Sequence, residues 1–332
     1  MVTGGSPAVD RPVVAVTAEL VGRALPDLEE AFEVRLHRGD QITDQEELIS
    51  FFQGARGAVT LLANPVTDRV LAACPELRVV ANCAVGFDNI DLDSARRHGV
   101  WVTNTPDVLT EATADLTWAL ILAVTRRLVE ADAYLRAGRY TGWRLDLLLG
   151  AGLQARRLGI VGYGRIGQAV ARRAAGFGME VAATDPTPPS RPEPPVELVP
   201  LPELLATSRV VSVHAPLTSS THHLLDEAAL RAMPQGSFLV NTSRGPLVDE
   251  GALVRVLESG HLGGAGLDVF EREPAVHPGL VGRDDVVLLP HVGSATIETR
   301  AAMAELAAAN ARAVLEGREP PTPVVRGRET GP

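Results

Sequence analysis

The chain has 332 residues, of which 45% are hydrophobic and 22% charged, and its formal net charge is −10. This length favours two domains, and a chain of ~300 residues buries roughly 75% of its unfolded surface. The net negative charge argues against a nucleic-acid partner, because a protein that binds nucleic acid needs a basic face. No apolar run reaches the ~20 residues of a membrane span. The N-terminus, MVTGGSPAVDRP, lacks the basic start and apolar stretch of a signal peptide, so we expect a cytoplasmic protein.

Short apolar or β-branched segments alternate with longer helical patterns along the chain. The predicted strands begin at residues 13, 58, 77, 100, 157, 179, 210, 237, 263 and 286. A long helix is predicted from Thr110 to Arg127, and an alanine-rich helix from Ile297 to Leu315. Such alternation predicts an α/β fold with parallel sheets.

A glycine-rich loop occupies the middle of the chain, within RLGIVGYGRIGQAVARRAAGFGMEVAATD. Its pattern is a strand, three glycines, a helix, and a second strand that ends at an aspartate. Together these features form the fingerprint of a dinucleotide-binding unit, in which N–H groups at the helix start bind pyrophosphate. The predicted cofactor-binding residues of this unit are Gly162, Gly164, Arg165, Ile166, Gly167 and Asp185.

The predicted cofactor is NAD(H), with NADP(H) less favoured. The carboxylate of Asp185 can accept hydrogen bonds from both hydroxyls of the adenosine ribose and would repel a 2′-phosphate. Arg191, in the proline-rich segment of residues 185–195, could offset that repulsion. The segment is interpreted as a rigid surface loop, because it lies inside the alternation of strands and helices.

The central position of the glycine loop predicts the domain boundaries. Residues 105–289 form the cofactor domain, whereas residues 1–104 and 290–325 form a substrate-binding domain to which the final helix returns. Residues 326–332, RGRETGP, are expected to be a disordered tail.

Several separated motifs resemble those of the D-isomer-specific 2-hydroxyacid dehydrogenases, and in particular the glyoxylate/hydroxypyruvate reductase branch. They are AVGFDNIDLDSARRHGVWVTNTPDVLTEATADL, GIVGYGRIGQAVARR, VHAPLT, LVNTSRGPLVDEGAL, GAGLDVFEREP and LPHVGSAT. The resemblance implies two Rossmann-like doubly wound parallel-sheet domains, a flavodoxin-like substrate domain and an NAD-binding domain. It also implies a small 2-oxo acid as substrate and a homodimer, for which the apolar segment 110–124 is a candidate interface unless it is buried within the monomer.

The resemblance further implies three catalytic residues, Arg244, Glu273 and His291. Reduction of a 2-oxo acid needs a cation for the carboxylate, and the planar guanidinium of Arg244 suits that role. His291, as an imidazolium, would give a proton to the carbonyl oxygen. Glu273 would accept the other ring N–H and favour the charged imidazole.

Other roles follow from the same resemblance. The backbone N–H groups of Val85 and Gly86 would bind the substrate carboxylate, and Ser294 is placed with the substrate-binding residues. No metal site is predicted. The remaining implied cofactor contacts are Thr113 near the nicotinamide, Pro216 beside the adenosine, Thr242 and Gly293 through their backbones, and Asp268 on the carboxamide.

Several alternatives stay open. The chain could be another D-2-hydroxyacid dehydrogenase, acting on phosphoglycerate or D-lactate, or a phosphite dehydrogenase, whereas Glu273 argues against a formate dehydrogenase. A non-enzymatic alternative is an NAD(H)-sensing binding protein of the corepressor type, since fold alone does not settle function. Trp143 is interpreted either as a wall of the substrate pocket, supplied by a neighbouring subunit, or as a core or interface residue.

Overall fold

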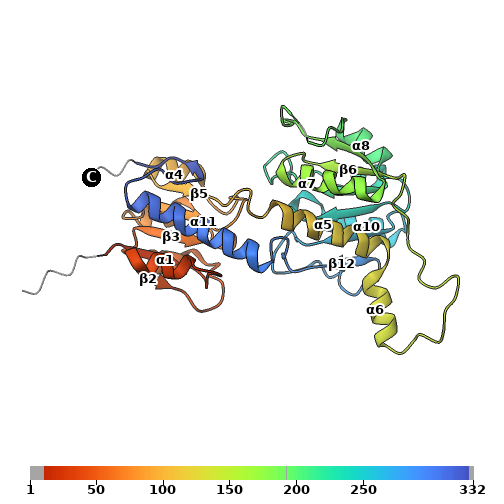
Figure 1. Ribbon diagram of the computed structural model, residues 1–332, viewed down its shortest axis with the longest axis horizontal. Coiled ribbons are helices and arrows are strands. Elements are labelled where there is room, and N and C mark those ends of the chain that lie inside the picture. Colours follow the sequence, from red (N-terminus) through yellow and green to blue (C-terminus); the bar gives the residue numbers. More distant parts are fainter. Residues whose placement is uncertain (1–10, 192, 329–332) are drawn as a thin grey trace, which may run out of the picture. The chain divides into compact units, whose positions relative to one another are not determined.

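The structure, a computed structural model, describes residues 11–191 and 193–328. The chain divides into two compact units, which can be followed by colour in Figure 1. One combines the residues before Thr110 with those after Ser294, and the other runs from Thr110 to Ser294. The sequence placed these boundaries at 104/105 and 289/290. Each unit is a largely parallel sheet between helices, so the predicted fold class is confirmed.

The first unit contains a six-stranded sheet in the order β13-β5-β4-β3-β1-β2. Its strands are β1 (Val13–Val16), β2 (Glu33–Leu36), β3 (Gly57–Thr60), β4 (Val79–Asn82), β5 (Trp101–Thr103) and β13 (Pro323–Val325). All neighbours pair in parallel except β13, which is antiparallel to β5. The order β2-β1-β3-β4-β5 is that of a flavodoxin-like sheet.

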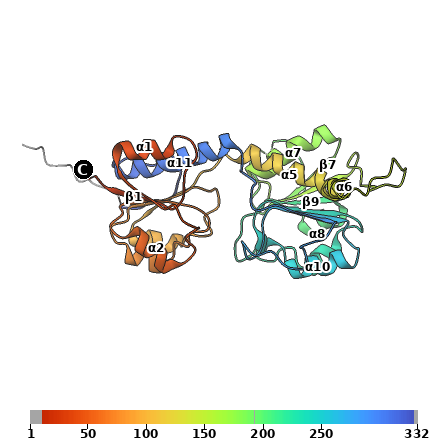
Figure 2. The same cartoon turned by 90° about the horizontal axis from the view of Figure 1, so that it is seen from below.

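Helices cover both faces of the first sheet. They are α1 (Ala24–Ala31), α2 (Gln45–Phe52), α3 (Asp68–Ala73), α4 (Leu92–His98) and α11 (Ile297–Leu315). Figure 2 shows α1 and α11 on one face and α2 on the other, in agreement with two separate core clusters. Helix α11 therefore returns the end of the chain to the first unit, as the sequence predicts.

The second unit contains seven parallel strands in the order β12-β11-β10-β9-β6-β7-β8. They are β6 (Arg157–Val161), β7 (Glu180–Thr184), β8 (Glu197–Leu198), β9 (Val210–Val213), β10 (Phe238–Asn241), β11 (Gly264–Leu267) and β12 (Val286–Leu288). The order reverses beside β6, at the switch point typical of a Rossmann sheet.

The helices of the second unit also lie on two faces. They are α5 (Thr110–Thr125), α6 (Leu128–Arg136), α7 (Arg165–Ala174), α8 (Leu201–Thr207), α9 (Glu227–Ala232) and α10 (Glu250–Glu258). Figure 2 shows α5 and α7 on one face of the sheet and α8 and α10 on the other. Helix α5 buries Trp118, Leu120, Ile121 and Val124 in a core cluster of its own unit. Burial within the monomer thus explains its apolar sequence without an interface.

The central strands of both sheets are largely buried, as expected where helices cover both faces of a parallel sheet. The four residues of β3, β4, β9, β10 and β11 are all buried. At the other end of the chain, the backbone N–H of Arg328 donates to the carbonyl of Gly99 at 2.9 Å. Of the predicted disordered tail, residues 329–332 lie outside the described residues.

Candidate active site

Most of the predicted site residues lie at the carboxyl ends of the strands in the second unit. In a parallel sheet this edge is where ligands bind, because the loops that leave the strands meet there. The residues that follow successive strands are Gly162 after β6, Asp185 after β7, Pro216 after β9, Thr242 after β10, Asp268 after β11 and His291 after β12.

The glycine loop between β6 and α7 has the geometry that a dinucleotide requires. Gly162 has φ +91°, and a Cβ atom there would overlap the backbone of Ala215. A Cβ atom on Gly167 would overlap the carbonyl of Gly162, so α7 approaches β6 closely. A Cβ atom on Gly164 would meet nothing within 4 Å, which leaves open space at the start of α7. The loop therefore fits a pyrophosphate held by backbone N–H groups.

The carboxylate of Asp185 holds the backbone of the glycine loop and of its own loop. Its Oδ2 accepts a hydrogen bond from the backbone N–H of Tyr163 at 2.7 Å, and its Oδ1 accepts from that of Thr187 at 2.8 Å. Each carboxylate oxygen can accept a second hydrogen bond. Oδ1 also lies 3.5 Å from the hydroxyl of Thr187, so Oδ2 is the oxygen that retains acceptor capacity for a ribose hydroxyl.

Tyr163 ties the proline-rich loop to the glycine loop, a role that the sequence did not reveal. Its ring is fully buried, and its hydroxyl donates to the carbonyl of Pro194 at 2.7 Å. Burial raises the pKa of Tyr163 to about 12, so the hydroxyl stays protonated as a donor. Arg191 lies exposed in this loop.

His291 and Glu273 form a hydrogen-bonded ion pair when the imidazole is protonated. The Nδ1 atom of His291 lies 2.8 Å from Oε2 of Glu273, and the side chains are 33% and 36% exposed. Burial alone would raise the pKa of Glu273, but the hydrogen bond and charge of His291, the N–H of Phe270 and the charge of Arg244 outweigh it. The net effect lowers the pKa of Glu273. The carboxylate is therefore ionised at neutral pH, and Nε2 of His291 is the ring nitrogen left for a ligand.

The backbone of His291 is held in an uncommon conformation by Asp268. His291 has φ +53°, which costs a non-glycine residue about 1–3 kcal/mol. Its N–H donates to the Asp268 carbonyl at 2.9 Å. The Asp268 carboxylate, which is fully buried, accepts from the N–H groups of Val292 and Gly293, both at 2.7 Å. Asp268, predicted as a carboxamide contact, thus also fixes the loop that carries His291.

Arg244 reaches the same region from the loop after β10. Its carbonyl accepts a hydrogen bond from Nδ2 of Asn241 at 2.9 Å, and its positive charge contributes to the lowered pKa of Glu273. The neighbouring Gly245 packs against the backbone of Phe270, where any Cβ atom would overlap. Glycine at this position lets the loop of Arg244 lie directly on the loop of Glu273.

The other predicted residues of the second unit lie around this group. The hydroxyl of Thr242 is 2.9 Å from that of Thr117, which donates to the Thr113 carbonyl at 2.8 Å. Gly293 faces Thr113, since a Cβ atom on Gly293 would lie 3.5 Å from Cγ2 of Thr113. Ser294 is the last residue of the unit. Val85 and Gly86 belong to the first unit, in the turn after β4.

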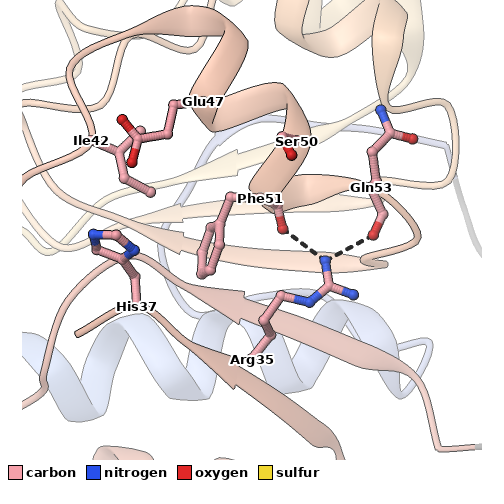
Figure 3. Close-up of a pocket in the computed structure, with 7 residues that line it drawn as sticks. All are labelled: Arg35, His37, Ile42, Glu47, Ser50, Phe51 and Gln53. Carbon is pink, nitrogen blue, oxygen red and sulfur yellow. Dashed lines mark hydrogen bonds between the residues drawn. The ribbon is translucent and has the colours of Figure 1, made fainter. Parts of the chain in front are cut away.

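Two surface hollows lie away from these residues. The larger, of about 560 Å³, is in the first unit between β2 and α2 (Figure 3). There Nη1 of Arg35 donates to the carbonyls of Phe51 and Gln53 at 2.7 and 2.8 Å, so Arg35 satisfies the end of α2. The second, of about 420 Å³, is lined by the end of α5, the start of α6, residues 149–151 and residues at the beginnings of β9 to β12, among them Arg209 and Asp285. Since it lies at the amino edge of the sheet, it is remote from the glycine loop.

Among the described residues 11–191 and 193–328, no group of three or more His, Cys, Asp or Glu side chains is arranged to hold a metal ion. No helix in that part of the chain has the length and apolar character needed to cross a membrane.

Comparisons with known proteins agree with the geometry. The NAD binding domain of D-isomer specific 2-hydroxyacid dehydrogenases matches residues 118–293. The glyoxylate reductase of Thermococcus onnurineus is 44% identical over 322 residues, which cover 95% of this chain and 96% of that protein. That of Korarchaeum cryptofilum is 46% identical over 316 residues, covering 94% and 95% of the two chains.

Solved structures show the same relationship. A protein from Thermus thermophilus is 49% identical, with a TM-score of 0.89, covering 94% of this chain and all of the other. An NADPH-dependent glyoxylate/hydroxypyruvate reductase from Sinorhizobium meliloti, in complex with NADP and malonate, is 36% identical. Its TM-score is 0.86, and the match covers 97% of this chain and 100% of that one. The chain is therefore an enzyme of the D-isomer specific 2-hydroxyacid dehydrogenase family, as its motifs predicted.

Proposed function

We propose that the enzyme reduces a small 2-oxo acid, glyoxylate or hydroxypyruvate or both, to the D-2-hydroxy acid at the expense of NADH. The observation that carries this proposal is the hydrogen bond between His291 and Glu273, which leaves Nε2 of His291 as the ring nitrogen available to donate a proton at the carboxyl edge of the cofactor-binding sheet. Glyoxylate reductases among the relatives support the choice of substrate.

In the proposed reaction, each residue acts on a different part of the substrate. Bound NADH supplies the hydride that reaches C2 of the oxo acid. His291 transfers its Nε2 proton to the carbonyl oxygen as charge develops there, and it is reprotonated from solvent after the product leaves. Glu273 stabilises the imidazolium, and Arg244 binds the carboxylate and polarises the carbonyl. The N–H groups of Val85 and Gly86 add further donors for the carboxylate.

The preference for NADH over NADPH rests on Asp185. A ribose 2′-phosphate would bring two negative charges toward a carboxylate that is anchored by two backbone hydrogen bonds and cannot swing away without losing them. The NADPH-dependent relative from Sinorhizobium meliloti makes the opposite preference a real alternative within the family. Comparison of kcat/KM for the two cofactors at one substrate concentration decides between them.

The proposed activity is tested by NADH oxidation with glyoxylate, hydroxypyruvate, pyruvate and phosphohydroxypyruvate. The proposal predicts the highest kcat/KM with glyoxylate or hydroxypyruvate. Preference for phosphohydroxypyruvate or pyruvate would favour one of the other dehydrogenases instead. Binding of NADH without turnover of any substrate would favour the NAD(H)-sensing alternative.

We also propose that the enzyme is a homodimer built through α6 and the segment that follows it. In Figure 1 this part extends away from the sheet of the second unit. It exposes an unusual number of large apolar side chains, which in a monomer would face water. They are Leu128, Val129, Leu135, Tyr140, Trp143, Leu145 and Leu149, each at least 50% exposed.

The exposure of Trp143, at 78%, rules out the core interpretation and leaves the interface or the neighbouring pocket. Sedimentation of the wild type should give a mass of about two chains. A Leu145→Asp variant should sediment as a monomer. The control variant Leu198→Asp, which changes another exposed surface, should sediment as a dimer like the wild type. A monomeric wild type would contradict the dimer but leave the proposed reaction untouched.

A further inference from the structure

The turn after β4 holds two successive carbonyl groups with side-chain amides. The carbonyl of Val85 accepts a hydrogen bond from Nδ2 of Asn104 at 2.8 Å. The next carbonyl, that of Gly86, accepts from Nδ2 of Asn82 at 2.9 Å. The peptide planes on both sides of Gly86 are therefore fixed, at a residue whose backbone would otherwise rotate more freely than any other.

The orientation of these carbonyls determines where the N–H groups point. In a planar trans peptide the N–H lies opposite the C=O. The N–H of Gly86 thus points away from Asn104, and the N–H of Val85 points away from Thr105, whose own N–H donates to the Ala84 carbonyl at 2.8 Å. Within the described part of the chain, neither of these two N–H groups donates to a protein acceptor. Two adjacent N–H groups are thus available to an external anion.

The two amides are themselves held in place. Asn82 is fully buried, and its Oδ1 accepts from the hydroxyl of Thr60 at 3.0 Å, which leaves the NH₂ group to face Gly86. The backbone carbonyl of Asn104 accepts from the hydroxyl of Thr322, next to β13, at 2.6 Å. The first contact sets the direction of the Asn82 amide, and the second holds the backbone that carries the Asn104 side chain.

We propose that Asn104 is a positioning residue that aims the N–H of Gly86 at the carboxylate of the substrate. Asn82 fixes the next peptide plane of the same turn. The inference rests on the proposed reduction of a 2-oxo acid, because it needs a carboxylate as the anion. A purely structural role would require the carbonyls to be satisfied but would not require N–H groups without partners on the opposite side.

The Asn104→Asp variant tests the inference with little change in shape. An Asp oxygen in place of Nδ2 would repel the Val85 carbonyl, so the peptide plane should rotate and withdraw the Gly86 N–H. We expect the KM for glyoxylate to rise about 10- to 100-fold. The turnover number should change less, since the N–H groups bind the carboxylate equally in the ground and transition states. The inhibition constant of oxalate, a carboxylate that cannot be reduced, should rise by a similar factor.

Asn64→Asp is the matched control. Asn64 is also buried in the first unit and donates through Nδ2 to the carbonyl of Ile42 at 2.9 Å, but it makes no hydrogen bond to residues 84–86 through its side chain. Its variant should keep the KM for glyoxylate within about threefold of the wild type, whatever its melting temperature. Asn104→Ala removes the donor without adding a charge and supplies the same test if the aspartate variant is unstable.

The inference is overturned if folded Asn104 variants bind glyoxylate and oxalate as tightly as the wild type, or if Asn64→Asp weakens both equally. Failure of the proposed function would look different, because the wild type itself would then reduce no 2-oxo acid.

Discussion

The charge of Glu273 is expected to contribute to turnover through His291, and a Glu273→Gln variant isolates it. The substitution keeps the size of the side chain and one oxygen acceptor near Nδ1 of His291, which lies 2.8 Å from the carboxylate. A hydrogen bond between charged groups contributes about 1.5–3 kcal/mol. Both side chains are about one-third exposed, at 33% and 36%, so solvent screening favours the lower end of that range.

A loss of about 1.5 kcal/mol corresponds to roughly a tenfold change in an equilibrium. We therefore expect kcat/KM for glyoxylate to fall about tenfold above neutral pH and less at pH 5.5, where protons are abundant. The high-pH limb of the pH–rate profile should move about one pH unit toward acid.

Stopped-flow NADH oxidation from pH 5 to pH 9 measures this shift. Glu316→Gln serves as the control, because Glu316 pairs with Arg312 in the first unit and takes no part in the proposed reaction. A Glu273→Gln variant whose profile keeps its shape, with the same loss at every pH, would refute the electrostatic role of Glu273.

Four other outcomes are expected. Asp185→Ser should raise the ratio of kcat/KM for NADPH over NADH at least about tenfold, measured by cofactor titration; an unchanged ratio would contradict the role of the carboxylate. Gly245→Ala should lower stability by about 1–3 kcal/mol in urea unfolding and reduce turnover, because its Cβ atom would overlap the Phe270 backbone. Burial lowers the pKa of His214 to about 3, whereas an unfolded histidine titrates near 6.5. Between these two pKa values His214 binds a proton only in the unfolded chain, so the melting temperature should fall from pH 7 to pH 4. The decrease should be smaller in His214→Asn. Trp143→Ala should leave the melting temperature of isolated monomers nearly unchanged, because the ring is 78% exposed, and a large decrease would show that it packs within its own chain.

The strands that could be predicted from sequence are those buried on both faces. Segments such as VVAV, VVSV and FLVN carry continuous apolar side chains because helices cover both sides of each sheet. The strands that were missed are at sheet edges. Strand β2, with the sequence EVRL, is partly exposed, β8 has two exposed residues, and β13 has three residues and pairs only with β5. These three segments are too short or too polar to reveal a strand, whereas β12, which is also at an edge, is apolar and was predicted.

The site residues that could be predicted are those whose type and position in a local pattern together indicate their role. Glycines in a strand–loop–helix pattern and a histidine after a strand are of this kind. The supporting contacts could not be predicted, because they join residues far apart in sequence. The carboxylate of Asp268 reaches the backbone of Gly293, and Tyr163 reaches Pro194. Such contacts depend on strand order and loop conformation, which the sequence pattern does not specify residue by residue.

The central claim is that His291 donates the proton to the substrate carbonyl. The most direct test is single-turnover oxidation of bound NADH by glyoxylate in the wild type and in His291→Ala, with the Kd for NADH measured on both by fluorescence. We expect an unchanged Kd and a rate about 10²- to 10⁴-fold lower in the variant, because the proton donor is lost while the cofactor site is intact. A variant that binds NADH normally and reduces glyoxylate within a few-fold of the wild-type rate would contradict it.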